Sequence, residues 1–174
     1  SINIGIDGDF APWVGTLIAD VKQPIILVTE KGKEEESVTR LSRVGFDNVI
    51  GHLEGGFKAW KKTDKAIDTI DRISAKKFAK ELKTNKGKVI DVRKEDEFCK
   101  GHVQGAQSKP LAYINDWIKD MDTKETFYIH CTSGFRSMIA ASILQARGFD
   151  NFKEIEGGFK AIEKTKIPKT DFEC

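Results

Sequence analysis

The chain has 174 residues, of which 39% are hydrophobic and 32% charged, a composition typical of one globular domain or two small ones and not of a disordered chain. Its 29 basic and 27 acidic side chains leave a net charge of +2, so we expect neither nucleic acid nor a membrane surface as a partner. The apolar runs are too short for a membrane span, no signal peptide is visible, and three cysteines are too few for a disulfide framework, so we expect a cytoplasmic location.

The first part of the chain predicts a strand at 24–29 and contains two segments that return later in the sequence. Residues 45–48 recur as 148–151, and residues 54–59 recur as 156–161, with a single one-residue gap between the matches. A repeat of this kind indicates that a small α/β domain has been duplicated.

The two copies are unequal in length. The second copy has a short apolar run that contains Asp91, at 88–92, for which the first copy has no counterpart. We therefore expect residues 1–62 to be the C-terminal part of one domain and residues 68–174 to be a complete domain.

The second copy alternates predicted helices and strands. In chain order they are a helix at 75–82 capped by Ser74, a strand at 89–92, a short helix at 95–100 ended by Gly101, a helix at 113–121, a strand at 126–130, a helix at 137–146, a strand at 152–155 and a short helix at 158–164. This alternation predicts an α/β fold, with a parallel sheet covered by helices on both faces. Ligands of such folds bind at the C-terminal ends of the strands.

The turn that follows the predicted strand at 126–130 is the candidate site. Cys131 ends the strand and faces the N-terminus of the next helix, where the helix dipole and free backbone N–H groups stabilise the nucleophilic thiolate. Ser133 and Gly134 are small enough for the backbone to close around the sulfur. Arg136 supplies a donor fork for an anionic substrate, and Ser137 is expected to bond the sulfur or cap the helix. A buried, inert thiol is the alternative, but the loop and the arginine together favour a nucleophile.

Three segments of the second copy resemble the motifs of rhodanese-type sulfurtransferases. Residues 131–137 read Cys-Thr-Ser-Gly-Phe-Arg-Ser and are similar to that family's active-site loop, a cysteine followed by x-x-G-x-R-S. Residues 89–106, with the run Val-Ile-Asp-Val-Arg and later Gly-His-Val, resemble its N-terminal signature, and residues 151–159 resemble its C-terminal one. The resemblance covers 68–174, and the first copy resembles the C-terminal part of the same domain.

The resemblance implies a rhodanese-like fold and a sulfur-transfer mechanism. The Cys131 thiolate would attack the outer sulfur of a small-molecule donor such as thiosulfate or a persulfide, and a thiophilic acceptor such as cyanide, sulfite or a thiol would remove the sulfur. Cys131 and Arg136 would be the catalytic residues, and no metal or other cofactor is needed. The loop residues that would hold the persulfide are Thr132, Ser133, Gly134, Phe135 and Ser137.

Four polar residues of the N-terminal signature are interpreted as structural support for the loop: Asp91, Arg93, Glu97 and His102. We expect Arg93 and Glu97 to form an ion pair that ties the strand to the short helix, with His102 packed beside them. His130, next to the cysteine, is expected to satisfy a backbone group and not to act as a base.

The first copy has no cysteine. We expect Glu30 to lie near the position of the nucleophile, in a loop about two residues shorter than its counterpart and without an arginine until Arg40. Acidic side chains at a helix N-terminus pair with the dipole but repel an anionic donor. The first copy is therefore expected to be inactive and structural, or to shape the entrance to the other site.

Residues 127–131, 136–142 and 169–174 most resemble one bacterial subgroup, in which a metallo-β-lactamase-fold persulfide dioxygenase precedes two rhodanese units and the first unit lacks its cysteine. This resemblance implies that such a domain lies upstream as a partner. Within this chain, His52, His102 and His130 are isolated in sequence and do not have the spacing of metal ligands.

Three alternatives to the enzyme remain. Cys131 as a non-catalytic persulfide carrier or docking module needs the same loop. A redox-sensing thiol would need Cys99 or Cys174 within disulfide reach of Cys131. Phosphatases of a related fold place five residues between cysteine and arginine, whereas four lie between Cys131 and Arg136 here, so a ring of amides wide enough for phosphate is not expected.

Overall fold

The computed structural model describes residues 1–84 and 87–170. The chain divides into two compact units: a larger unit, in which Ser1–Asn3 joins Ile70 and the residues after it, and a smaller unit, Ile4–Thr69.

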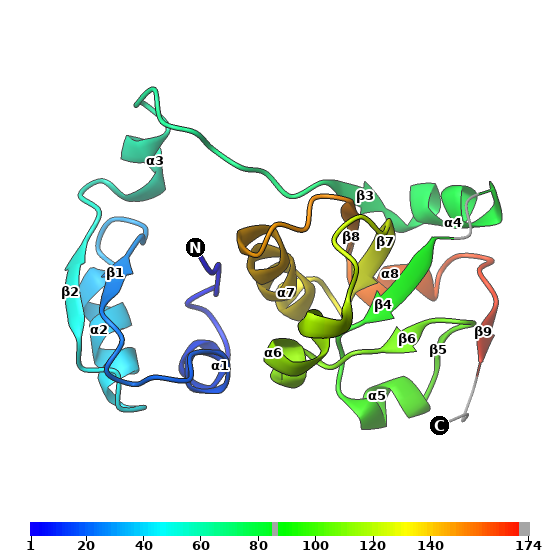
Figure 1. Cartoon of the computed structure of the whole chain (residues 1–174), viewed down its shortest axis with the longest axis horizontal. Helices are drawn as coiled ribbons and strands as arrows, with labels where there is room; N and C mark the ends of the chain where they lie inside the picture. The colour runs from blue at the N-terminus through cyan, green and yellow to red at the C-terminus, as the bar shows by residue number, and fades with distance from the viewer. Residues whose placement is uncertain (85–86, 171–174) are drawn as a thin grey trace. The chain divides into compact units, whose positions relative to one another are not determined.

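The described part of the larger unit is built on a five-stranded parallel sheet (Figure 1). In spatial order its strands are β3 (Arg72–Ser74), β8 (Phe152–Glu156), β7 (Phe127–His130), β4 (Lys88–Asp91) and β6 (Gln107–Ser108). The middle strand β7 is buried along its whole length, which explains its apolar sequence. The chain order reverses direction between β4 and β7, and in open parallel sheets such a switch point is where ligands bind.

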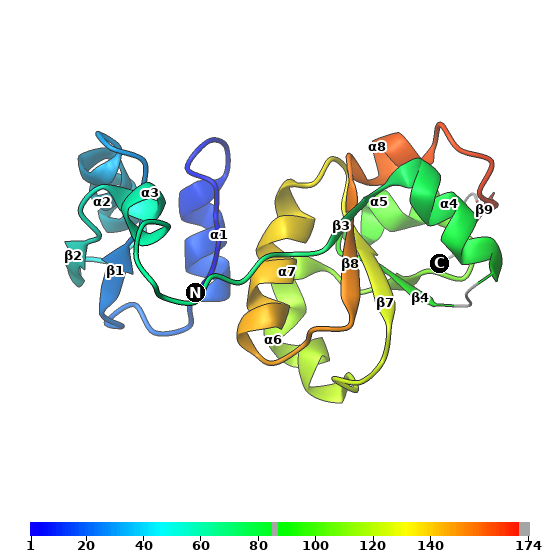
Figure 2. The same ribbon diagram turned by 90° about the horizontal axis from the view of Figure 1, so that it is seen from above.

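Helices cover both faces of this sheet (Figure 2). One face carries α4 (Ala75–Thr84) and α8 (Gly158–Ile162), and the other carries α6 (Ile114–Trp117) and α7 (Phe135–Ala146). The short helix α5 (Glu95–Cys99) follows β4, and β5 (His102–Val103) pairs antiparallel with β9 (Lys169–Thr170).

The predicted alternation of strands and helices is confirmed. One expected helix is interrupted, and four short strands of the larger unit were not predicted. The helix expected at 113–121 is a single α-helical turn, α6, flanked by 3-10 turns at Leu111–Tyr113 and Ile118–Asp120. Strands β3, β5, β6 and β9 were not expected, because two or three residues are too few to show an alternation. The predicted cap is present, since the Lys77 N–H donates to Ser74 Oγ at 3.3 Å.

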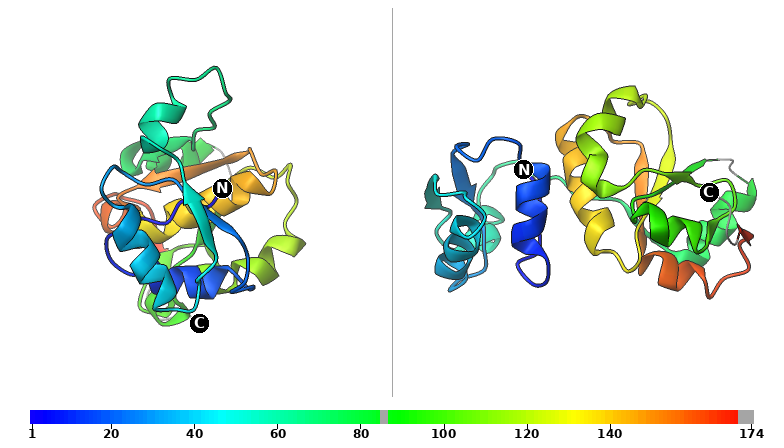
Figure 3. Two further views of the ribbon diagram at one scale, coloured as in Figure 1. Left: turned by 90° about the vertical axis from the view of Figure 1, so that its left-hand side faces the viewer. Right: turned by 90° about the horizontal axis from the view of Figure 1, so that it is seen from below.

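The smaller unit has a two-stranded parallel sheet of β1 (Ile25–Leu27) and β2 (Val49–His52) (Figure 3). Its helices are α1 (Phe10–Leu17), α2 (Glu34–Ser42) and α3 (Gly56–Trp60). Its core consists of Phe10, Val14, Leu27, Leu41 and Phe46. Among the described residues of both units, each helix is too short or too polar to cross a lipid bilayer.

Candidate active site

Cys131 directly follows the C-terminal end of β7, beside the switch point of the sheet. Its thiol is free and its side chain is buried. The backbone turns at Gly134, where φ is +115°, and α7 begins at the next residue. As a result the Gly134 N–H donates to the cysteine Sγ at 3.2 Å, and the Ser137 hydroxyl oxygen lies 3.5 Å from Sγ. The sulfur therefore faces the N-terminus of a twelve-residue helix, where the dipole and free N–H groups stabilise a thiolate.

Helix α8 packs directly against the backbone of this loop. The Phe159 N–H donates to the Cys131 carbonyl at 2.7 Å, and the Lys160 N–H donates to the Thr132 carbonyl at 3.1 Å. This approach requires glycine at 158, because a Cβ there would overlap the Cys131 carbonyl oxygen and lie 2.8 Å from the Ser133 nitrogen. No role was predicted for Gly158 from the sequence alone. The pair Gly157-Gly158, repeated as Gly55-Gly56, could have indicated a backbone with positive φ.

Arg136 and Glu97 form a two-pronged ion pair at the rim of the site. Arg136 Nη2 lies 2.8 Å from Glu97 Oε1, Nη1 contacts the other carboxylate oxygen, and Thr132 Oγ1 donates to Oε1 at 2.8 Å. Arg136 Nη2 also donates to Thr132 Oγ1. The hydrogen bonds from Arg136 lower the pKa of Glu97 to about 2, and the carboxylate in turn raises the pKa of Arg136. Both Nη atoms of Arg136 are therefore already bonded to protein side chains.

The expected ion pair between Arg93 and Glu97 is wrong, because each residue has another partner. Arg93 donates from Nε to both oxygens of Asp91, at 3.0 and 2.9 Å, and from Nη2 to the Gly101 carbonyl at 2.7 Å. Its guanidinium carbon lies 4.1 Å from the centre of the Phe159 ring. Asp91 and Arg93 are both buried, so this pair joins β4 to the end of α5 and to α8.

The two histidines of the larger unit contact backbone or hydroxyl groups. His102 stacks on Phe98, and its ring nitrogens lie 3.0 Å from the Phe98 carbonyl and 2.9 Å from Thr170 Oγ1. His130 Nδ1 lies 3.2 Å from the Cys131 carbonyl, and burial lowers the pKa of this imidazole, so it is neutral at pH 7. The expectation that His130 contacts a backbone group is confirmed.

The remaining predicted residues line the loop with different exposure. Ser133 is exposed, Thr132 and Phe135 are half-buried, and Gly134 and Ser137 are buried. Cys99 is half-buried on α5 and is disulfide-bonded, so the expectation that it only packs there is wrong, whereas Cys174 lies outside the described residues. Within 1–84 and 87–170, no three His, Cys, Asp or Glu side chains gather into a group able to hold a metal ion.

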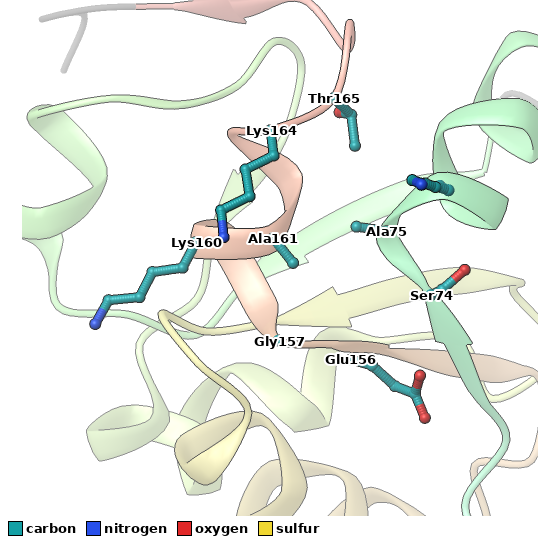
Figure 4. Close-up of a pocket in the computed structure, with 9 residues that line it drawn as sticks. Ser74, Ala75, Glu156, Gly157, Lys160, Ala161, Lys164 and Thr165 are labelled. Carbon is teal, nitrogen blue, oxygen red and sulfur yellow. The ribbon is translucent and has the colours of Figure 1, made fainter.

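A surface pocket of about 440 Å³ lies between α4 and α8 (Figure 4). Ala75 and Ala161 line it from the two helices, and the side chain of Lys160 extends away from α4. Cys131 is not among its lining residues. The chemistry of the thiol therefore belongs to the loop and not to this pocket.

The smaller unit contains a similar contact between a glycine and the carbonyl of a loop residue. A Cβ on Gly56 would overlap the Thr29 carbonyl, just as one on Gly158 would overlap that of Cys131. Thr29 therefore has the contact that Cys131 has in the larger unit, and Glu30, expected near the position of the nucleophile, is the next residue. Gly32 lies three residues after Thr29 and has a positive φ of +85°, and Gly134 lies three residues after Cys131 with a φ of +115°. The Gly32 N–H is already bonded, to Glu34 Oε2 at 2.7 Å.

The ion pair of Glu97 gives a pH-dependent stability. Its carboxyl pKa is lowered from 4.5 to about 2, so its contribution is complete above pH 4.5 and is lost as the pH falls toward 2. In urea titrations we expect Glu97→Gln to be less stable than wild type by about 2 kcal/mol at pH 7, after allowance for partial exposure, and equally stable only below pH 2. Glu95→Gln, an exposed acid on the same helix, is the control. A deficit in Glu97→Gln that does not change with pH would contradict the ion pair.

Residues 1–63 and 74–165 match the family model described as the rhodanese-like domain. Among solved structures, a rhodanese-like domain protein from Staphylococcus aureus superimposes with a TM-score of 0.52 and 27% identity, over 57% of this chain and 97% of that one.

Curated relatives match parts of the chain. The thiosulfate sulfurtransferase GlpE of Ectopseudomonas mendocina is 32% identical over 87 residues, half of this chain and 80% of that protein. The putative sulfur carrier protein YrkF of Bacillus subtilis is 23% identical over 142 residues, which cover 78% of this chain and 77% of YrkF. YqhL, also of Bacillus subtilis, is 35% identical over 75 residues, and this match spans only 60% of its length.

Proposed function

Because the chain belongs to the rhodanese-like domain family, we propose that it is a sulfurtransferase that moves sulfane sulfur from thiosulfate or a persulfide to a thiophilic acceptor through a persulfide on Cys131. The observation that carries this proposal is the buried free thiol whose Sγ accepts the Gly134 N–H at the start of α7. A single sulfur atom fits a cradle of backbone N–H groups, which stabilise negative charge wherever it develops.

The reaction has two displacements. The Cys131 thiolate attacks the outer sulfur of thiosulfate, a bond forms between Sγ and that sulfur, and sulfite leaves with the electron pair of the broken S–S bond. The anionic persulfide then gives its outer sulfur to cyanide, which leaves as thiocyanate and restores the thiolate. Both steps conserve charge and need no external oxidant or reductant.

The loop side chains have a supporting part in this proposal. Since Glu97 already compensates the charge of Arg136, we assign to Arg136 and Thr132 the task of holding the loop in shape. The backbone N–H groups of residues 132–136 then bind the outer sulfur. Asp91, Arg93 and His102 hold the strand and helix ends on which the loop rests.

A second candidate is a persulfide carrier with little turnover of its own. The long match to a protein named as a putative sulfur carrier favours it. Steady-state thiocyanate formation from thiosulfate and cyanide separates the two candidates. Saturable turnover supports the enzyme, one sulfur transferred per chain and no further supports the carrier, and no transfer from thiosulfate or glutathione persulfide contradicts both.

We further propose that residues 1–62 are the C-terminal part of an inactive rhodanese-like copy and 68–174 a complete one. The repeated segments and the two glycine contacts, at Gly56 and Gly158, support it. In the smaller unit Thr29 replaces the nucleophile, and the carboxylate of Glu34 occupies the N–H that corresponds to the one facing Sγ. An upstream metallo-β-lactamase-fold persulfide dioxygenase as the sulfur source is a proposal supported by the sequence resemblance alone.

A further inference from the structure

A buried carboxylate lies behind the nucleophile and belongs to none of the roles assigned above. Glu154, on β8, has a fully buried side chain. Its Oε2 accepts the Arg72 Nε–H at 2.8 Å, and its Oε1 accepts the Ser137 hydroxyl at 2.7 Å. Acidic side chains are almost never fully buried unless they are paired, and the pairing here leads through Ser137 to the sulfur.

The Ser137 hydroxyl has one proton and three acceptors within reach. Glu154 Oε1 lies at 2.7 Å, the Gly134 carbonyl at 3.1 Å and the Cys131 Sγ at 3.5 Å. A hydrogen bond to an ionised carboxylate at the shortest distance is the strongest of the three. The proton therefore points to Glu154, and the hydroxyl oxygen turns its lone pairs toward the sulfur.

This orientation distinguishes the two states of the cysteine. A thiolate without bound sulfur carries its full charge on Sγ. It then faces the lone pairs of the Ser137 oxygen, and the carboxylate of Glu154 lies behind that oxygen. A persulfide carries its charge on the outer sulfur, one bond farther from Ser137, while Sγ itself is uncharged. Repulsion from the Glu154 side is therefore larger for the thiolate than for the persulfide.

We propose that Glu154 is a positioning residue that, by fixing the direction of the Ser137 hydroxyl, shifts the equilibrium at Cys131 from the empty thiolate toward the sulfur-loaded persulfide. This inference rests on the proposed sulfur transfer. Arg72 limits the effect, because its guanidinium compensates part of the carboxylate charge.

The test is an equilibrium measurement on the whole chain. The protein is mixed with thiosulfate and sulfite at fixed ratios, and intact mass spectrometry gives the fraction of chains carrying one extra sulfur. The balance Cys131–S⁻ + S₂O₃²⁻ ⇌ Cys131–S–S⁻ + SO₃²⁻ defines a loading constant, which a purely structural role of Glu154 would leave unchanged in the folded protein.

Two variants have opposite expected effects. In Glu154→Gln the new amide can donate to Ser137, which frees the hydroxyl proton for the sulfur, so the loading constant is expected to fall about tenfold. In Arg72→Gln the carboxylate loses its compensating charge, so the constant is expected to rise severalfold. Arg72 is partly exposed on the edge strand β3, so this variant keeps the test available if Glu154→Gln fails to fold.

Glu156→Gln is the matched control, because it removes a carboxylate from the same strand and also near Arg72, at 3.8 Å, without touching Ser137. Its loading constant is expected to stay within about twofold of wild type. In a Ser137→Ala background the effect of Glu154→Gln is expected to shrink to less than about twofold. An effect of full size in that background would contradict the relay through Ser137.

The outcomes separate this inference from the proposed function. If wild type never gains sulfur at any thiosulfate ratio, the sulfurtransferase proposal fails. If wild type loads, but Glu154→Gln has an unchanged or larger loading constant, or both variants shift it in the same direction, only the role of Glu154 is overturned.

Discussion

Cys131→Ser is expected to lower thiocyanate formation from thiosulfate and cyanide about a thousandfold or more, to the rate without protein. The serine hydroxyl does not ionise near neutral pH and forms no persulfide, although it fits the same space beside the Gly134 N–H. Thiocyanate is measured at saturating thiosulfate, for variants that unfold at the same urea concentration as wild type.

Thr29→Ser is the control, because Thr29 has the same contact with Gly56 in the smaller unit that Cys131 has with Gly158, and it carries no thiol. It is expected to keep the turnover within about twofold. Turnover that survives Cys131→Ser would place the nucleophile elsewhere and contradict the proposed mechanism.

Gly158→Ala is expected to cost about 3 kcal/mol of unfolding free energy and most of the sulfur transfer. The added methyl group overlaps the Cys131 carbonyl oxygen and approaches Ser133 N and Thr132 C to 2.8 Å, so the loop backbone that carries the sulfur must move. Urea titration gives the stability, and the thiosulfate assay gives the transfer.

Gly148→Ala separates this clash from the cost of positive φ. Gly148 has a φ of +88°, but a Cβ there meets no atom within 4 Å. It is expected to lose only about 1 kcal/mol and to keep its activity. Equal losses in the two variants would show that the contact between α8 and the loop is unimportant.

The parts of the fold that could be predicted are those with long apolar patterns. Strand β7 and helices α4 and α7 each bury several consecutive or periodically spaced side chains, and all three were expected. The edge strands β3 and β6 could not be predicted, because three and two residues carry no period. Their pairing depends on neighbouring strands that are distant in sequence.

The loop of the candidate site could be read from its residues, but its ion pairs could not. Spacing alone favoured Arg93 as the partner of Glu97, whereas the fold brings Arg136, 39 residues away, to that carboxylate. Glu154 left no signal in the sequence, because Lys153 and Glu156 of the same strand are also charged, and its partners Arg72 and Ser137 come from other elements.

The intact mass of the protein after incubation with thiosulfate is the direct test of a persulfide on Cys131. We expect a gain of one sulfur atom, located by peptide mapping to the segment that contains Cys131, absent in Cys131→Ser and removed by cyanide. No gain with thiosulfate or with glutathione persulfide, in a folded protein whose Cys131 is reduced, would contradict it.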